Sequence, residues 1–197
     1  MNVTSEGIGG KMKENSQSRS SKEWIIDSLI YLLKTKPYSA ITITEIAKKA
    51  GVARLTFYRH FENKEEIIIT RSQYLFQKYF DELNNKDKKL DLNESLLLCF
   101  KYWKQDSEAI KLLEKNNLIY LLENTFYLFL EKLIEETRIL NKLNPIQKYF
   151  IIGGLTHSMV FWITTSTPLS PEEVSETIIN LFNLKVASHT EDNTIDL

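Results

Sequence analysis

Cysteine and histidine are scarce in this chain of 197 residues, which contains one cysteine and three histidines. The lone Cys99 excludes an intrachain disulfide, and His60, His157 and His189 lie far apart, without the paired spacing of metal ligands. The six glycines form no phosphate-binding loop, and no nucleophile elbow is present. These absences argue against an enzyme and predict no metal or other cofactor.

Long hydrophobic runs are also absent. No apolar stretch is long enough to span a membrane, and the N-terminal segment lacks the hydrophobic region of a signal peptide. We therefore expect a cytoplasmic protein with no membrane partner. The formal net charge is −1, but residues 1–71 carry 12 basic against 8 acidic side chains, and the remainder carries 13 against 18. This asymmetry weakly favours contact between the N-terminal third and nucleic acid.

The alternating pattern of β-strands does not occur, so we predict an all-α fold of about nine helices. Two helix starts are clearly marked, because Asn144 and Ser170 each precede a proline at the first helical position, and Glu173 completes a capping box with Ser170. In the C-terminal two thirds of the chain, helices are predicted over 92–104, 107–115, 118–140, 145–165 and 171–186.

The N-terminal third begins with a segment rich in Gly, Ser and Asn, which predicts a disordered tail over 1–19. Its basic residues Lys11, Lys13 and Arg19 are available to touch DNA, although a plain disordered end is the better interpretation. Ser20 and Glu23 form a capping pair that predicts a helix from Ser20. The remaining predicted divisions are a helix-turn-helix domain (20–69), a helical regulatory and dimerisation domain (70–186) and a C-terminal tail (187–197).

Thr42 to Phe61 is the most informative segment, because it predicts two helices joined by a tight turn. Thr42 and Glu45 form a capping box, and Gly51 stands where the first helix must end in a residue of positive φ. The second helix, from about Ala53 to Phe61, is basic and contains no acid, as DNA-reading helices require for phosphate and base-edge contacts.

This segment resembles the DNA-binding domain of the TetR family of bacterial transcriptional regulators, with the likeness extending over about 20–69. The matching motifs are Thr42, Ile46-Ala47, Ala50-Gly51-Val52, Thr56-Phe57-Tyr58, Phe61 and Lys64. The resemblance implies that Thr42, Tyr58 and Lys64 contact phosphates and that Arg54, Leu55 and Arg59 face the groove. The full set of candidate DNA-binding residues is Thr42, Thr44, Arg54, Leu55, Thr56, Tyr58, Arg59, His60 and Lys64.

Two residues depart from the family pattern. Ala53 stands where the family often has a serine or threonine cap, which removes one expected phosphate contact and weakens the start of the helix. Leu55 stands where a glycine is common, so its side chain touches a thymine methyl or crowds the groove.

The resemblance further implies a homodimer whose last two helices pair with those of the second subunit. Gly153 and Gly154 fit this interface because small residues allow close helix approach, and Phe161 on the same predicted helix is a third candidate. A flexible point in the helix is the alternative interpretation of the glycine pair. A dimer of this kind reads an inverted repeat in double-stranded DNA.

Aromatic residues are dense in the predicted body and suit a mostly apolar effector pocket. The candidates are Trp103, Tyr120, Phe126 and Trp162, with His157 as a polar anchor. Aromatics at helical spacing more often fill a core, so core packing is the alternative.

The C-terminal segment also resembles a TetR subgroup that includes regulators of dihydroxyacetone kinase operons. The likeness rests on the glycine pair, the aromatic end of its helix and the SPEE restart. Such regulators are controlled by a protein partner in some cases. Two functions therefore stay open: a bacterial repressor modulated by a small-molecule effector, and a protein-interaction co-regulator or activator with weak DNA binding.

Overall fold

The computed structural model describes residues 16–85, 91–137, 143–165 and 167–187, and every regular element in these ranges is helical. The prediction of an all-α fold is therefore confirmed for the described chain. The chain divides after Lys64 into two compact units, which we call the head and the body. Most of the predicted N-terminal tail, and nearly all of the C-terminal one, lies outside the described residues.

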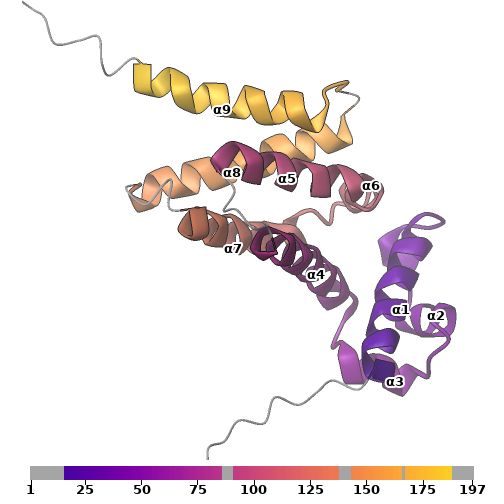
Figure 1. Cartoon of the computed structure of the whole chain (residues 1–197). Helices are drawn as coiled ribbons and strands as arrows, with labels where there is room; N and C mark the ends of the chain where they lie inside the picture. The colour runs from indigo at the N-terminus through magenta and orange to yellow at the C-terminus, as the bar shows by residue number, and fades with distance from the viewer. Residues whose placement is uncertain (1–15, 86–90, 138–142, 166, 188–197) are drawn as a thin grey trace, which may run out of the picture. The chain divides into compact units, whose positions relative to one another are not determined.

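In its described residues, the head contains three α-helices and one short 3-10 helix, coloured indigo to magenta in Figure 1. These are α1 (Ser16–Leu33), η1 (Tyr38–Ala40), α2 (Ile43–Lys49) and α3 (Arg54–His60). The predicted start of α1 at Ser20 was wrong by four residues, since no glycine or proline interrupts the chain after Ser16. The helix η1 directly follows Pro37 and was not predicted.

Local chemistry sets the boundaries of α2. The hydroxyl of Thr42 accepts a hydrogen bond from the Glu45 amide at 3.2 Å, and the Glu45 carboxylate accepts one from the Thr42 amide at 2.9 Å, so the predicted capping box is confirmed. Gly51 has a φ of +68°, in the left-handed region that a residue with a Cβ rarely adopts. The Val52 amide then donates to the Ala47 carbonyl at 3.0 Å and closes the turn.

The body begins within α4 (Lys64–Asn84), a helix of 21 residues whose first residue belongs to the head. The helices that follow are α5 (Leu92–Gln105), α6 (Ser107–Lys115), α7 (Tyr120–Thr137), α8 (Pro145–Thr164) and α9 (Pro171–Ala187). Both predicted proline starts are confirmed, because Asn144 caps α8 in a box with Gln147, and the Ser170 hydroxyl accepts from the Glu173 amide at 3.2 Å.

Within the body, α9 packs along α5, and α8 packs against α5, α6 and α7 (Figure 1). The core between these helices is strongly apolar and holds Phe100, Ile110, Leu113, Met159 and Trp162. Of the described helices, none is both long and apolar enough to cross a membrane.

Candidate nucleic-acid interface and effector cavity

Helix α3 is anchored in the head by Phe57 and by Phe61, the residue that directly follows it. Phe57 is fully buried and Phe61 is 2 % exposed, and their ring centroids lie 5.9 Å apart. Ile46 and Ala47 of α2 are buried in the same head, and α1 packs against both α2 and α3. Burial of one face fixes the rotation of α3, so its remaining side chains are held toward solvent.

The exposed face of α3 carries Arg54, Leu55, Tyr58 and Arg59. Leu55 is 65 % exposed and Tyr58 is 46 % exposed, which is unusual for large apolar and aromatic side chains. The Arg54 guanidinium donates to the Tyr58 hydroxyl at 3.1 Å and lies 5.6 Å from its ring centroid. The face thus presents two cations, one bound to a phenol, and no acid, a combination suited to phosphates and base edges.

Thr42 and Thr44 are exposed on α2, whereas Thr56 and His60 on α3 are half-buried. Thr42 is also occupied, because its hydroxyl donates to the Glu45 carboxylate at 2.9 Å while accepting from the Glu45 amide. The structure therefore brings most of the predicted DNA-binding residues onto exposed positions of one small unit and leaves Thr56 and His60 less accessible.

Glu45 joins the start of α2 to the end of α1. It forms an ion pair with Lys36, and its carboxylate also accepts from the amide and the hydroxyl of Thr42. The pKa of Glu45 is lowered to about 2. The largest cause is the hydrogen bond from the Lys36 ammonium, and the two Thr42 donors contribute next.

We expect this lowered pKa to make the stability of the head depend on acid pH. A carboxyl group whose folded pKa lies below its unfolded pKa of 4.5 stabilises the fold above that value, and the contribution is lost as the pH falls toward about 2. In Glu45→Gln the unfolding free energy should therefore change less with pH across this window, as measured by urea unfolding. Glu176→Gln, which removes an exposed acid from α9, is the control and should retain the slope of the parent; an equal slope in Glu45→Gln would contradict the assignment.

Lys64, predicted to contact phosphate, is half-buried and already bound within the head. Its Nζ donates to the Ile41 carbonyl at 2.7 Å and to the Tyr38 carbonyl at 3.0 Å, and lies 4.0 Å from the Tyr38 ring centroid. These bonds join the start of α4 to η1 and to Ile41, the residue that follows it. Lys64 thus braces the head in this structure.

Lys64→Met is expected to lower the free energy of unfolding by about 2 kcal/mol, because it removes two charge-assisted hydrogen bonds and leaves their carbonyls unpaired. Thermal and urea unfolding of the full chain measure this loss. The same substitution at the exposed Lys48 of α2 is the control. Unchanged stability combined with weaker DNA binding would show that Lys64 is a phosphate contact instead of a brace.

One face of α8 carries large apolar side chains in solvent within the single chain. Ile146 is 81 % exposed, Tyr149 68 % and Phe161 62 %. The two predicted interface glycines lie on the same helix, and a Cβ at Gly153 or Gly154 would meet no atom within 4 Å. His157 is also exposed, with its Nδ1 2.9 Å from the Gly153 carbonyl. Nothing within the described chain therefore requires glycine at either position.

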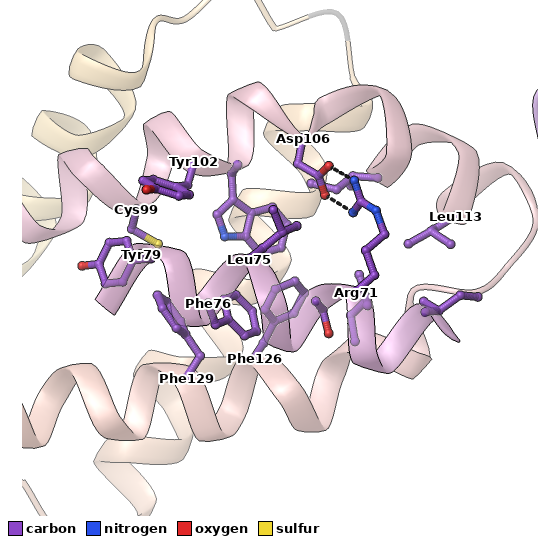
Figure 2. A pocket seen from close by; sticks show the side chains of 15 residues that line it. Arg71, Leu75, Phe76, Tyr79, Cys99, Tyr102, Asp106, Leu113, Phe126 and Phe129 are labelled. Carbon is purple, nitrogen blue, oxygen red and sulfur yellow. Dashed lines mark hydrogen bonds and ion pairs between the residues drawn. The ribbon is translucent and has the colours of Figure 1, made fainter. Parts of the chain in front are cut away.

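The body contains a cavity between α4, α5, α6 and α7, lined by aromatic rings (Figure 2). Its open volume is about 40 Å³. Trp103 and Phe126, two of the predicted effector residues, line it with their ring centroids 4.3 Å apart. Phe76 stacks on Phe129 at 4.2 Å in the same wall.

The other three predicted effector residues lie elsewhere. Tyr120 is 59 % exposed at the start of α7, and His157 is exposed on α8. Trp162 is buried, with its Nε1 donating to the Leu169 carbonyl at 2.9 Å and its ring meeting Phe100 edge to face. Trp162 therefore packs the core and positions the segment before α9.

Sequence reasoning missed the contribution of α4 to this cavity. The α4 residues that line the cavity are Ile68, Arg71, Ser72, Leu75, Phe76 and Tyr79. Their spacing of three and four residues marks one face of a helix. The sequence pattern could therefore have predicted this face. An arginine within that apolar series was the available signal for a polar group in the cavity.

Helix α3 follows a glycine turn, buries one face and exposes cations on the other. These features define the head as the DNA-binding domain of a helix-turn-helix transcriptional regulator. Residues 25–69 match the family model described as "Bacterial regulatory proteins, tetR family". The chain thus carries a TetR-type DNA-binding domain over these residues.

The chain is also similar to three known proteins. The uncharacterized HTH-type transcriptional regulator YerO of Bacillus subtilis is 27 % identical over 180 residues, which cover 80 % of this chain and 62 % of YerO. The biofilm operon icaADBC HTH-type negative transcriptional regulator IcaR of Staphylococcus epidermidis is 31 % identical over 46 % of this chain and 50 % of IcaR. The solved structure of the dihydroxyacetone kinase operon activator DhaS superposes with a TM-score of 0.59 at 19 % identity, covering 85 % of this chain and 96 % of DhaS.

The chain matches less than two thirds of the length of these two curated relatives. At 19 % identity, the likeness to DhaS shows a shared fold. The fold prediction and the family resemblance are therefore confirmed, and all three relatives are named as regulators of transcription.

Proposed function

We propose that this protein is a homodimeric repressor that binds an inverted-repeat operator in double-stranded DNA and is modulated by an effector held in the body. The observation that carries the proposal is the exposed face of α3, where Arg54, Tyr58 and Arg59 stand on a helix anchored by buried phenylalanines. The functional DNA-binding domain extends to residue 69, where the family match ends, and the regulatory domain spans 70–186. A cytoplasmic location follows from this function.

Dimerisation is supported by the apolar face of α8. One stripe along this helix consists of residues spaced four apart, namely Tyr149, Gly153, His157 and Phe161. Exposed apolar patches of this kind mark association surfaces, and a two-fold axis pairs the same stripe of each subunit. A dimer holds two recognition helices at a fixed separation, which suits half-sites one DNA turn apart, about 34 to 36 Å, or a multiple of it.

The direction of regulation is proposed from the simpler mechanism. IcaR, named as a negative regulator, is 31 % identical over 46 % of this chain, and DhaS of Lactococcus lactis, named as an activator, is 28 % identical over 43 %, so the named relatives do not separate the two directions. Repression needs no contact beyond DNA binding, because a dimer bound at a promoter blocks access to it.

A protein-interaction co-regulator with weak DNA binding is the second candidate. It is favoured by the start of α3, where Ala53 provides no side-chain cap, and by Lys64, whose ammonium is bound to carbonyls of the head. Both features reduce the phosphate contacts available near the helix ends.

Selection of bound duplexes from a random DNA library, at low and at higher salt, tests the proposal. We expect the full chain to recover an inverted repeat whose binding survives the higher salt, with two subunits per duplex in sedimentation. Recovery of random sequence alone, lost at higher salt, would overturn sequence-specific repression and favour the co-regulator, since nonspecific binding depends on counterion release.

A further inference from the structure

We propose that the cavity of the body binds a small apolar monocarboxylate, whose carboxylate replaces that of Asp106 on the Arg71 guanidinium. This inference rests on the proposed function, because it names the chemical class of the effector. It is argued from one ion pair, the cavity wall around it and the position of Asp106 between two helices.

Arg71 of α4 and Asp106 form a two-pronged ion pair at the cavity (Figure 2). The Arg71 Nη1 donates to Asp106 Oδ2 at 2.6 Å, and its Nη2 donates to the other carboxylate oxygen. The two side chains are only 21 % and 15 % exposed. Among the fifteen described residues that line the cavity, these two alone are charged. The planar guanidinium fork recognises a carboxylate by shape, so a ligand carboxylate fits the same two donors.

The rest of the wall suits an apolar group. It includes the rings of Phe76, Trp103, Phe126 and Phe129. Burial raises the pKa of the Cys99 thiol to about 12, so this side chain is neutral as well. An open space of about 40 Å³ holds a few waters, whereas pockets for drug-sized ligands span roughly 300–1,000 Å³. The cavity therefore selects a small ligand with one flat or short apolar part.

The position of Asp106 favours an anionic ligand over a cationic one. Asp106 follows α5 and precedes α6 as its N-cap residue, yet its side chain makes no capping hydrogen bond. Once displaced from Arg71, its carboxylate has the amide donors of the first turn of α6 as an alternative. Arg71 has no such alternative, since no second acid lines the described wall. Anion exchange keeps Arg71 paired, whereas a cation on Asp106 would leave the half-buried Arg71 guanidinium unpaired.

The exchange would also alter a link between helices. The helix α4 runs without a break from Lys64 of the head past Arg71, which lies about 10 Å further along the axis at 1.5 Å per residue. Arg71 ties this helix to the junction of α5 and α6. A ligand that releases this tie binds the two states of the body with different affinity, which is the condition for control of DNA binding.

Calorimetric titration of the full chain with matched probes tests the site. Butyrate, butyramide and butylamine share one short chain and differ in charge, and the corresponding compounds of roughly three and five carbons extend the series within a cavity that holds a few waters. We expect the acids to bind at least about tenfold more tightly than the amides or amines.

Two variants separate the roles of the pair. Arg71→Gln is expected to abolish binding of the acids, because it removes the guanidinium fork. Asp106→Asn is expected to tighten it by about tenfold, because the internal competitor loses its charge. The controls are Lys101→Gln and Glu172→Gln, which change the same charges in an exposed ion pair of 2.9 Å between α5 and α9; they should bind the acids like the parent.

All variants are first checked for a native melting transition by circular dichroism. Binding of the amines in preference to the acids, with loss on Asp106→Asn, would overturn the proposal and assign a cation site. Failure of every probe to bind the folded parent would overturn it as well.

The titrations need no DNA, so this inference and the proposed function fail separately. If the parent selects an inverted repeat but binds no acid, the carboxylate site is wrong and the repressor stands. If it binds the acids but selects no duplex, the site stands and the repressor is wrong. With both present, we expect the best acid to weaken duplex binding by at least about tenfold; unchanged duplex affinity would overturn its role as effector.

Discussion

Phe161→Glu should convert the dimer to monomers and lower affinity for the selected inverted repeat by at least about a hundredfold, since two linked half-site contacts bind roughly 10² to 10⁴ times more tightly than one. Phe161 is 62 % exposed in the single chain, so a polar side chain there costs the fold of each subunit little. In a two-fold interface both subunits carry the substitution, so two like charges enter an apolar contact. Sedimentation velocity measures the association, and fluorescence anisotropy measures binding to the duplex.

Tyr120→Glu is the matched control for this experiment. Tyr120 is 59 % exposed at the start of α7 and does not belong to the α8 stripe. We expect this variant to remain dimeric and to bind the duplex like the parent. A Phe161→Glu protein that stays dimeric would show that the subunits associate through another surface.

The capped helix starts could be predicted from sequence because capping depends on neighbours within three or four residues, whereas the start of α1 was missed. Thr42 with Glu45, and Ser170 with Glu173, form their predicted hydrogen bonds. The same holds for Gly51, whose positive φ follows from the tight turn that it enters.

Contacts between segments far apart in the sequence could not be predicted from such local patterns. Arg71 and Asp106 are 35 positions apart, and Lys64 lies 26 positions from Tyr38. Only the packing of the helices brings these pairs together. The family resemblance implied a phosphate contact for Lys64, and no pattern in the sequence predicted a partner for Arg71. Aromatic spacing predicted a cluster in the body, yet it could not separate Trp103 at the cavity from the exposed Tyr120.

The exposed face of α3 yields the second large effect. Arg54→Ala is expected to weaken binding by about 1–3 kcal/mol for each half-site, so a dimer loses at least about thirtyfold, and base preference relaxes at one position of each half-site. Tyr58→Ala should weaken binding to every sequence, because the family resemblance implies that Tyr58 contacts the phosphate backbone. Repeating the duplex selection with each variant distinguishes these two results.

The hydrogen bond between Arg54 and Tyr58, 3.1 Å long, makes the two side chains dependent on each other. Tyr58→Phe removes the hydroxyl but keeps the ring, so it isolates the contribution of that bond to the orientation of Arg54. If the bond orients Arg54 for a base edge, Tyr58→Phe relaxes the same position as Arg54→Ala, and the double variant loses less than the sum of the two single losses. Lys111→Ala, which removes an exposed cation from α6, controls for charge. Arg54→Ala with the affinity and preference of the parent would remove Arg54 from the groove.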